Sequence, residues 1–190
     1  MGTHNPYRRK NKNLFMIKSD TMKISVQKLN INNCSQATAI YNYYVENTTA
    51  TYATIPVSEK EFADYYKIDD EKTVAYRYFL DGTEAGFGLL KPYDEKKQAF
   101  DKTYEITLYL HKDFCGKGLG KEVVAHLEER AKELGLVTLI SIISTENTES
   151  CRLFEKCGYE LCGHVKKAGI KFERFLGLYF YQKILEDMDI

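Results

Sequence analysis

The most informative segment of this sequence is a glycine-rich run, Phe114-Cys115-Gly116-Lys117-Gly118-Leu119-Gly120-Lys121. It lies between a predicted strand, residues 103–111, and the start of an amphipathic helix. Small residues in such a turn let backbone N–H groups converge, and the helix N-terminus adds partial positive charge. The run therefore predicts an anion-binding site, and we expect its ligand to carry phosphate.

Two common phosphate-binding motifs do not fit this run. A P-loop would need glycine in place of Cys115 and serine or threonine in place of Glu122. A dinucleotide fingerprint that begins at Gly116 would need glycine or alanine in place of Lys121. The remaining alternative is a glycine-rich turn that begins a helix and binds no ligand.

Helix and strand patterns alternate on both sides of the run. Upstream, they predict a strand, two helices and three strands, at residues 23–29, 33–46, 58–69, 73–80, 84–91 and 103–111. Downstream, they predict a helix, a strand, a helix and two strands, at residues 119–134, 136–144, 147–156, 159–167 and 172–184. This order predicts an α/β (α+β) layer fold, with a mixed central sheet of about seven strands flanked by about four helices on both faces.

Composition narrows the class of protein. The chain has 190 residues with 44% hydrophobic content, and its 27 basic side chains balance 27 acidic ones, so no net field favours nucleic acid or a membrane as partner. The five cysteines are odd in number and follow no secretory signal, which favours reduced thiols in the cytoplasm. No apolar run is long enough to cross a bilayer, so a soluble protein is expected.

The first 21 residues differ from the rest. They carry five Lys or Arg side chains against one acid, Asp20, and show little apolar periodicity. We predict a flexible basic leader at residues 1–21, whose origin as a vector-derived tag, a natural tail or a targeting segment stays open. Residues 22–190 are predicted to form a single domain, because no repeat or Pro/Gly-rich linker divides them.

Four further stretches accompany the glycine-rich run. They are residues 40–52 (IYNYYVENTTATY), 104–110 (YEITLYL), 146–150 (ENTES) and 169–176 (GIKFERFL). Together with Gly118 and Gly120, they resemble the GNAT superfamily of N-acetyltransferases, and most closely its phosphinothricin and methionine sulfone/sulfoximine acetyltransferase branch. The chain departs from the family pattern at Cys115, where relatives carry Arg or Gln at the start of the pyrophosphate loop.

The resemblance implies an activity and a set of ligand contacts. The chain would transfer acetyl from acetyl-CoA to the primary amine of a small molecule, and we also expect a homodimer. The fourth predicted strand and the glycine-rich loop with the helix start after it would bind the cofactor. The start of the predicted helix at residues 147–156 would also contact it. These positions are Leu108, Tyr109, Leu110, Gly116, Lys117, Gly118, Leu119, Gly120, Lys121, Asn147 and Ser150. Asn147 and Ser150 also fit a second role, as caps of the helix that follows.

Glu105 is the predicted general base. An alkylammonium must lose a proton before its nitrogen can attack a thioester, and a carboxylate accepts that proton directly or through water. The resemblance assigns this role to Glu105, whereas a solvated residue at a strand start is the alternative. Many relatives carry a tyrosine where this chain has Phe154, and a phenyl ring cannot protonate the leaving thiolate. Either solvent protonates the thiolate or it leaves unprotonated.

The resemblance also implies the acceptor contacts. They are Asn47, Thr49, Thr51, Tyr52, Lys171 and Arg174. An α-amino acid brings a carboxylate that Lys171 or Arg174 could bind. Relatives that acetylate phosphinothricin carry arginines before the catalytic strand, whereas residues 92–103 of this chain contain none. We therefore expect methionine sulfone or sulfoximine as acceptor; the alternatives are a peptide acetyltransferase or a non-catalytic acyl-CoA-binding module.

No metal site is expected. Cys157 and Cys162 lack a second pair of ligands at zinc spacing, so we predict buried free thiols there. His126 falls on a predicted helix and is expected at the surface.

Overall fold

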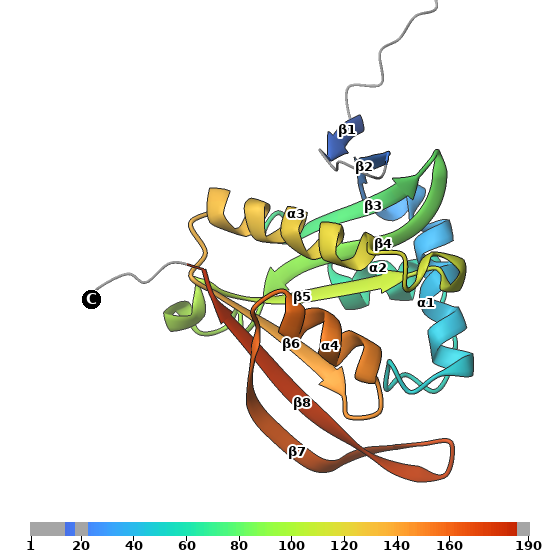
Figure 1. The fold of residues 1–190 in the computed structure, drawn as a ribbon, viewed down its shortest axis with the longest axis vertical. Helices are drawn as coiled ribbons and strands as arrows, with labels where there is room; N and C mark the ends of the chain where they lie inside the picture. Colours follow the sequence, from blue (N-terminus) through green and yellow to red (C-terminus); the bar gives the residue numbers. More distant parts are fainter. Residues whose placement is uncertain (1–13, 18–22, 186–190) are drawn as a thin grey trace, which may run out of the picture.

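The computed structural model describes residues 14–17 and 23–185. They form eight strands, β1 (Leu14–Ile17), β2 (Ile24–Lys28), β3 (Val74–Leu80), β4 (Thr83–Pro92), β5 (Thr103–Leu110), β6 (Thr138–Ser144), β7 (Glu160–Lys171) and β8 (Arg174–Ile184). The four α-helices are α1 (Ser35–Asn47), α2 (Glu59–Tyr66), α3 (Leu119–Glu133) and α4 (Thr148–Lys156). The strands form one mixed sheet in the order β1-β2-β3-β4-β5-β6-β8-β7, in which only β5 and β6 are parallel neighbours (Figure 1).

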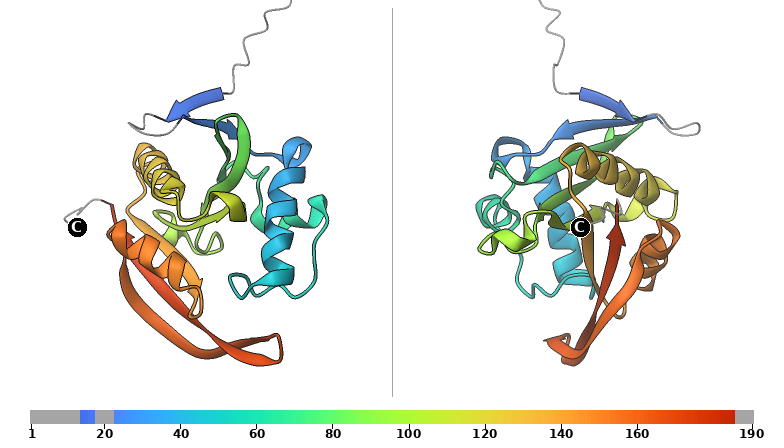
Figure 2. Two further views of the ribbon diagram at one scale, coloured as in Figure 1. Left: turned by 45° about the vertical axis from the view of Figure 1, so that its right-hand side comes forward. Right: turned by 90° about the vertical axis from the view of Figure 1, so that its left-hand side faces the viewer.

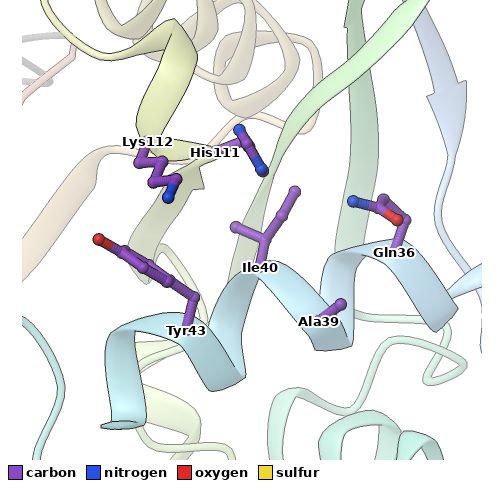
Figure 3. Close-up of a pocket in the computed structure, with 6 residues that line it drawn as sticks. All are labelled: Gln36, Ala39, Ile40, Tyr43, His111 and Lys112. Carbon is purple, nitrogen blue, oxygen red and sulfur yellow. The ribbon is translucent and has the colours of Figure 1, made fainter. Parts of the chain in front are cut away.

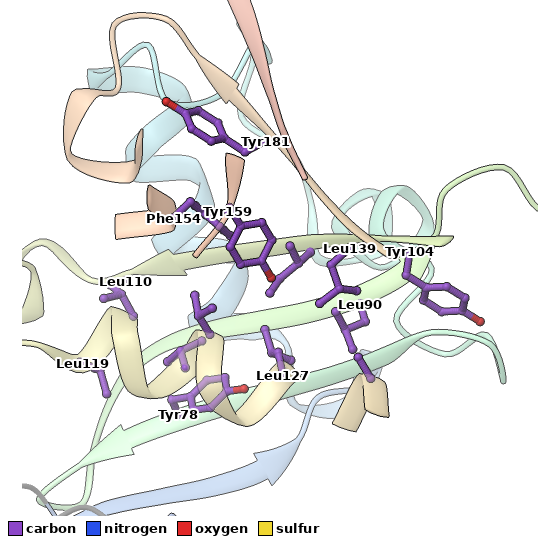
Figure 4. Packing of buried hydrophobic residues seen from close by; sticks show 14 of the residues in the cluster. Tyr78, Leu90, Tyr104, Leu110, Leu119, Leu127, Leu139, Phe154, Tyr159 and Tyr181 are labelled. Carbon is purple, nitrogen blue, oxygen red and sulfur yellow. The ribbon is translucent and has the colours of Figure 1, made fainter. Parts of the chain in front are cut away.

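Helices cover both faces of the sheet, as predicted. α1 and α2 enclose one hydrophobic cluster, in which Phe62 and Phe87 are fully buried and their rings meet edge to face at 5.2 Å. α3 and α4 enclose the other cluster on the opposite face (Figure 2). There Leu127 of α3 packs with Tyr78 and Leu90 of the strands beneath it (Figure 4). The amphipathic pattern predicted after the glycine-rich run is confirmed in α3, whose apolar side chains are buried against the sheet.

Local signals correctly placed several element boundaries. Ser58 and Glu61 have the three-residue spacing of a capping box in the sequence, and they form one at the start of α2. Asp81 and Gly82 have positive φ values of 50° and 84°, which close the β3–β4 hairpin with a turn that matches the strand twist. Gly135, with φ of 65°, follows the end of α3.

The sheet extends further toward the N-terminus than predicted. Residues 14–17 belong to the predicted leader, but they form β1, which pairs antiparallel with β2 from Leu14 opposite Gln27 to Ile17 opposite Ile24. The run Leu-Phe-Met-Ile is short, and its strand character depends on the unpaired edge that β2 offers. The sheet consequently has eight strands instead of about seven. The rest of the predicted leader, residues 1–13 and 18–21, lies outside the described residues.

Three further expectations need correction. β7 runs to Lys171 instead of ending at residue 167, because the long β7–β8 hairpin continues past a bulge. His126 is half-buried, and its Nδ1 lies 2.9 Å from the hydroxyl oxygen of buried Tyr78. Cys162 is exposed, since it sits at a second bulge in β7, and Cys157 is half-buried; both are free thiols.

Candidate functional site

β5 and β6 run side by side only at their beginnings. Thr103–Glu105 pair with Thr138–Ile140, and among the described residues no later position of the two strands pairs (Figure 1). β4 pairs along the other edge of β5, and β8 pairs along the other edge of β6. The facing edges after Glu105 therefore offer main-chain groups that have no strand partner.

Alternation along β5 shows which main-chain groups face this opening. The His111 N–H donates to the carbonyl of Ala85 (2.8 Å), so the main chain at His111 is directed toward β4. The main-chain N–H and C=O groups of successive residues point alternately to the two edges of a strand. Those of Tyr109 therefore face β4, and those of Leu108 face β6. The geometry thus supports a main-chain contact with ligand at Leu108. It does not support one at Tyr109, whose ring packs in parallel with that of Phe87, 5.4 Å away.

Leu110 ends the exposed edge and is anchored by α1. The Tyr44 hydroxyl donates to the Leu110 carbonyl (2.6 Å) and lies 3.6 Å from the Cys115 thiol. Burial, followed by the neighbouring thiol, raises the pKa of Tyr44 far above its usual value, so the hydroxyl stays a donor. At the position where relatives carry Arg or Gln, Cys115 therefore joins the contact between α1 and the start of the loop.

The glycine-rich loop presents a row of backbone donors. Gly116 and Gly118 have φ values of 72° and 86°, which glycine adopts without the strain that a Cβ would add. Within the part of the chain that the structure describes, the N–H groups of residues 116–120 donate to no protein acceptor. These N–H groups lie at the N-terminal end of α3, where the helix dipole is positive. Lys117 and Lys121 add positive charge. This cradle fits a pyrophosphate.

Gly120 serves packing as well. A Cβ at this position would lie 3.0 Å from a side-chain carbon of Leu153, so its small size brings α3 close to α4. Substitution of Gly120 would disturb the fold together with any bound ligand. Gly118 is therefore the better position at which to test ligand binding by the loop.

Glu105 lies at the last paired position before the strands separate. One carboxylate oxygen accepts from the Thr107 hydroxyl (3.2 Å), and the other lies 3.3 Å from the Lys91 ammonium nitrogen. Because Glu105 is the register partner of Ile140, its side chain shares the face of the sheet that continues onto β6 and β8. The carboxylate is thus anchored beside the free main-chain edge of β5. The sequence patterns did not reveal Lys91, since its contact with Glu105 depends on strand register.

That face of the sheet is not covered by helices beyond β5. α1 contacts β4 and β5, whereas Ile142 on β6 stays 37% exposed and its register partner on β8 is half-buried Phe180. Val165 lies on the same face and is also exposed. Ile142, Phe180 and Val165 therefore form an apolar floor that extends from Glu105 toward the β7–β8 hairpin.

The loop after α1 closes one side of this floor. The ring of Tyr52 packs on Gly169 of β7, where a Cβ would come within 2.8 Å of the ring, and its hydroxyl donates to the Gly177 carbonyl (2.6 Å). Thr51 is only 7% exposed, and its hydroxyl is engaged with that of Tyr41 (3.0 Å). Tyr52 therefore connects this loop to the hairpin, and the buried contact of Thr51 with Tyr41 fixes the loop against α1.

Of the two remaining predicted acceptor contacts, Asn47 is the last residue of α1 and Thr49 lies in the loop after it. Asn47 is exposed and donates from its side-chain amide to the Tyr43 carbonyl at the end of α1 (2.9 Å). Thr49 is half-buried.

The two predicted carboxylate-binding residues differ in their surroundings. Arg174 is exposed and paired with the carboxylate of Glu146 (2.7 Å). Lys171 is 3% exposed and donates to the carbonyl oxygens of Thr51 (2.9 Å) and Tyr44 (3.4 Å). Burial lowers the pKa of Lys171 from its usual value. Among the described residues Lys171 has no carboxylate partner, so its positive charge is not neutralised.

The helix after β6 has the capping role that the sequence also allowed. The side chain of Asn147 accepts from the Ser150 N–H (3.1 Å) and caps α4. Phe154, on the same helix, is buried in the core against Tyr159, at a ring distance of 4.8 Å (Figure 4). Its ring supplies no proton, as expected.

A shallow pocket of about 110 Å³ lies beside the start of the glycine-rich loop. It is formed by one side of α1 and the end of β5, and is lined by Gln36, Ala39, Ile40, Tyr43, His111 and Lys112 (Figure 3). Sequence patterns did not indicate it, because its two walls are more than 60 residues apart in the chain.

Among the residues that the structure describes, no three His, Cys, Asp or Glu side chains gather as metal ligands. None of the helices described is both long and apolar enough to cross a membrane.

The chain is similar to known proteins of one family. The model of the Acetyltransferase (GNAT) family matches residues 37–159. The L-methionine sulfoximine/L-methionine sulfone acetyltransferase of Pseudomonas aeruginosa is 30% identical over 87% of this chain and 96% of its own. The phosphinothricin N-acetyltransferase of Streptomyces viridochromogenes is 29% identical over 77% and 80%. A solved phosphinothricin acetyltransferase from Sinorhizobium meliloti, in complex with acetyl-CoA, is 27% identical, with a TM-score of 0.79 over 85% of this chain and 88% of that one.

The chain belongs to the GNAT family of acetyltransferases. It is an acetyl-CoA-dependent N-acetyltransferase. The homodimer and the cytoplasmic location stay predictions.

Proposed function

We propose that this enzyme acetylates the primary amine of an α-amino acid whose side chain is polar but uncharged, of the methionine sulfone or sulfoximine type, with Glu105 as general base. One observation carries the proposal. The Glu105 carboxylate is anchored where the free main-chain edge of β5 begins, on the face that continues as the apolar floor.

Several groups of this chain would bind and orient acetyl-CoA. Acetyl-CoA supplies the activated acetyl group as a thioester. The backbone amides of residues 116–120 would hold its pyrophosphate, and the main chain at Leu108 would pair with its pantetheine arm. An N–H on the same edge is suited to stabilise negative charge that develops on the thioester oxygen. The side-chain amide of Asn147, whose oxygen caps α4, would add a contact to the arm.

Proton removal is assigned to Glu105. The two contacts of its carboxylate leave lone pairs on both oxygens for an ammonium group or a bridging water. Accepting that proton exposes the amine nitrogen as nucleophile. Phe154 takes no part, so the thiolate leaves unprotonated or takes its proton from solvent.

Lys171 supports the choice of an amino acid. Among the described residues its buried ammonium group contacts two carbonyl oxygens and the ring of Phe172 but no carboxylate, so a substrate carboxylate would lower the cost of its burial. Arg174 is already paired with Glu146 and would at most contribute at the edge of the site. The relatives from Pseudomonas aeruginosa and Streptomyces viridochromogenes are both named for amino-acid acceptors.

Phosphinothricin is expected to be a weaker acceptor, because its phosphinate adds a negative charge. Residues 92–103 contain no arginine, and Lys97 is paired with Asp94 (3.2 Å). The apolar floor with Ile142 offers no cation either. A sulfone or sulfoximine has polar oxygens without that charge.

The test is thiol release from acetyl-CoA with one enzyme preparation. We expect kcat/KM to be highest for methionine sulfone or sulfoximine, lower for phosphinothricin, and lowest for spermidine and an N-terminal peptide. A peptide as the best acceptor would replace the amino-acid assignment with a protein acetyltransferase. Binding of CoA without thiol release over a broad amine panel would instead indicate a non-catalytic module.

A further inference from the structure

Lys91 occupies the position directly across from Glu105. The two residues are register partners in the antiparallel pair of β4 and β5. Their side chains therefore leave the same face of the sheet at neighbouring points, where opposite charges attract. The Lys91 ammonium nitrogen lies 3.3 Å from one Glu105 oxygen, and the two side chains are 20% and 21% exposed.

Two tyrosines of α2 surround the other side of the ammonium group. Its nitrogen lies 5.4 Å from the ring centre of Tyr65 and 5.9 Å from that of Tyr66. The faces of aromatic rings attract cations, so these contacts hold the amine near the end of β4. Glu105 is the only carboxylate in an ion pair with Lys91 among the described residues.

Together with Thr107, Lys91 fixes both oxygens of the carboxylate. Thr107 donates to one oxygen and Lys91 contacts the other, so rotation of the carboxylate would break a contact. The titratable groups that face Glu105 are Lys91 from β4 and Tyr65 from α2. The contacts with Thr107 and Lys91 thereby hold the carboxylate in one orientation.

We propose that Lys91 is a positioning residue of the reaction, which acts through Glu105 and does not touch either substrate. This inference rests on the proposed role of Glu105 as general base. Loss of the Lys91 ammonium group would release one carboxylate oxygen from its contact and leave the carboxylate free to rotate away from the reacting amine. The chemical step would slow, because small displacements of a catalytic group reduce its rate strongly.

The test compares variants of Lys91 with the unmodified enzyme, using kcat and KM for both substrates. Lys91→Met keeps the length of the side chain without its charge, and we expect kcat to fall about tenfold with KM for acetyl-CoA within about twofold. Lys91→Arg keeps the charge and should restore most of the rate. Lys91→Gln serves as a second uncharged variant if Lys91→Met melts below the assay temperature.

Lys183→Met is the matched control. Lys183 is also a partly buried lysine, 2.8 Å from the Glu128 carboxylate and 5.5 Å from the ring centre of Tyr159, but on the opposite side of the sheet. Its loss should leave kcat unchanged when activity is measured below the melting temperature.

The double variant separates a role through Glu105 from a general structural role. If Lys91 acts through the base, Lys91→Met should not slow an enzyme that already carries Glu105→Gln. Equal losses in both backgrounds, or unchanged kcat in Lys91→Met, would overturn the inference while Glu105 kept its role. Full activity of Glu105→Gln would overturn the proposed mechanism and this inference with it.

Discussion

The ammonium group of Lys171 donates to the main-chain carbonyl of Thr51, 120 residues earlier in the chain, at 2.9 Å. The bond joins the β7–β8 hairpin to the loop after α1. A second bond, to the Tyr44 carbonyl at 3.4 Å, places the cation at the C-terminal end of α1, where the helix dipole favours positive charge. The ammonium group that we propose as partner of the substrate carboxylate therefore also holds the hairpin, the loop and the end of α1 together.

Replacing Lys171 with methionine should weaken the amino-acid acceptor. We expect KM for methionine sulfone to rise by about tenfold or more, because a charge-assisted contact is lost, with little change in the Kd for acetyl-CoA. Steady-state kinetics and calorimetry measure the two effects. Lys167→Met, on the exposed part of the same hairpin, is the control. An unchanged KM would exclude Lys171 as the carboxylate partner.

Lys171 should also leave a signature in the pH dependence of stability. Burial lowers its pKa below the usual 10.5, so between the two values the unfolded state binds more protons than the folded state. The contribution of Lys171 to the free energy of unfolding should therefore rise with pH up to about 10.5. Denaturant titrations at pH 8, 9 and 10 measure it as the difference between the native chain and Lys171→Met. A difference that stayed constant across this range would contradict the lowered pKa.

Glu105→Gln should remove the base while keeping its shape. We expect kcat to fall by about 10²-fold or more, within the range that general acid–base catalysis contributes. The Kd for acetyl-CoA should stay nearly unchanged, since the cofactor contacts lie along the free edge and the loop. Stopped-flow thiol release and calorimetry check both expectations. Native turnover at neutral pH would remove Glu105 from the mechanism.

Gly118→Ala should raise the Kd for CoA several-fold, because a Cβ would crowd the row of amides. Gly82 in the β3–β4 turn is a matched control, since its φ of 84° is close to the 86° of Gly118 and a Cβ there meets no atom within 4 Å. Both variants should lose about 1 kcal/mol of stability from backbone strain. Calorimetry should show weaker CoA binding only in Gly118→Ala. Equal affinities would argue against a phosphate role for the loop.

Tyr44→Phe should loosen the end of β5. The variant loses the bond to the Leu110 carbonyl, which we expect to cost about 1–3 kcal/mol of stability because the carbonyl is left without its donor. The Kd for CoA should rise, since Leu110 leads into the loop. Tyr43→Phe, which alters the exposed neighbouring ring, should change neither quantity. Chemical denaturation and CoA titration of the two variants make the comparison.

The sequence by itself determined the local structure of this protein and the chemistry of its cofactor loop. The two strands at residues 73–80 and 84–91 were predicted and are found, and the capping-box spacing of Ser58 and Glu61 marks the start of α2, because such signals depend on neighbours within a few positions. The positive φ values at Gly116 and Gly118 likewise follow from the glycine residues themselves. Glu105, identified by a family resemblance, lies beside the opening between β5 and β6.

Only the tertiary structure decided which side chains meet. The pairing of Lys91 with Glu105 depends on the register of two strands separated by ten residues of loop, and the contact of Lys171 with Thr51 spans most of the domain. The same holds for β1, whose four residues become a strand only because β2 presents an unpaired edge. The physical reason is that register and docking are set by the summed packing of whole elements, so no local pattern encodes them.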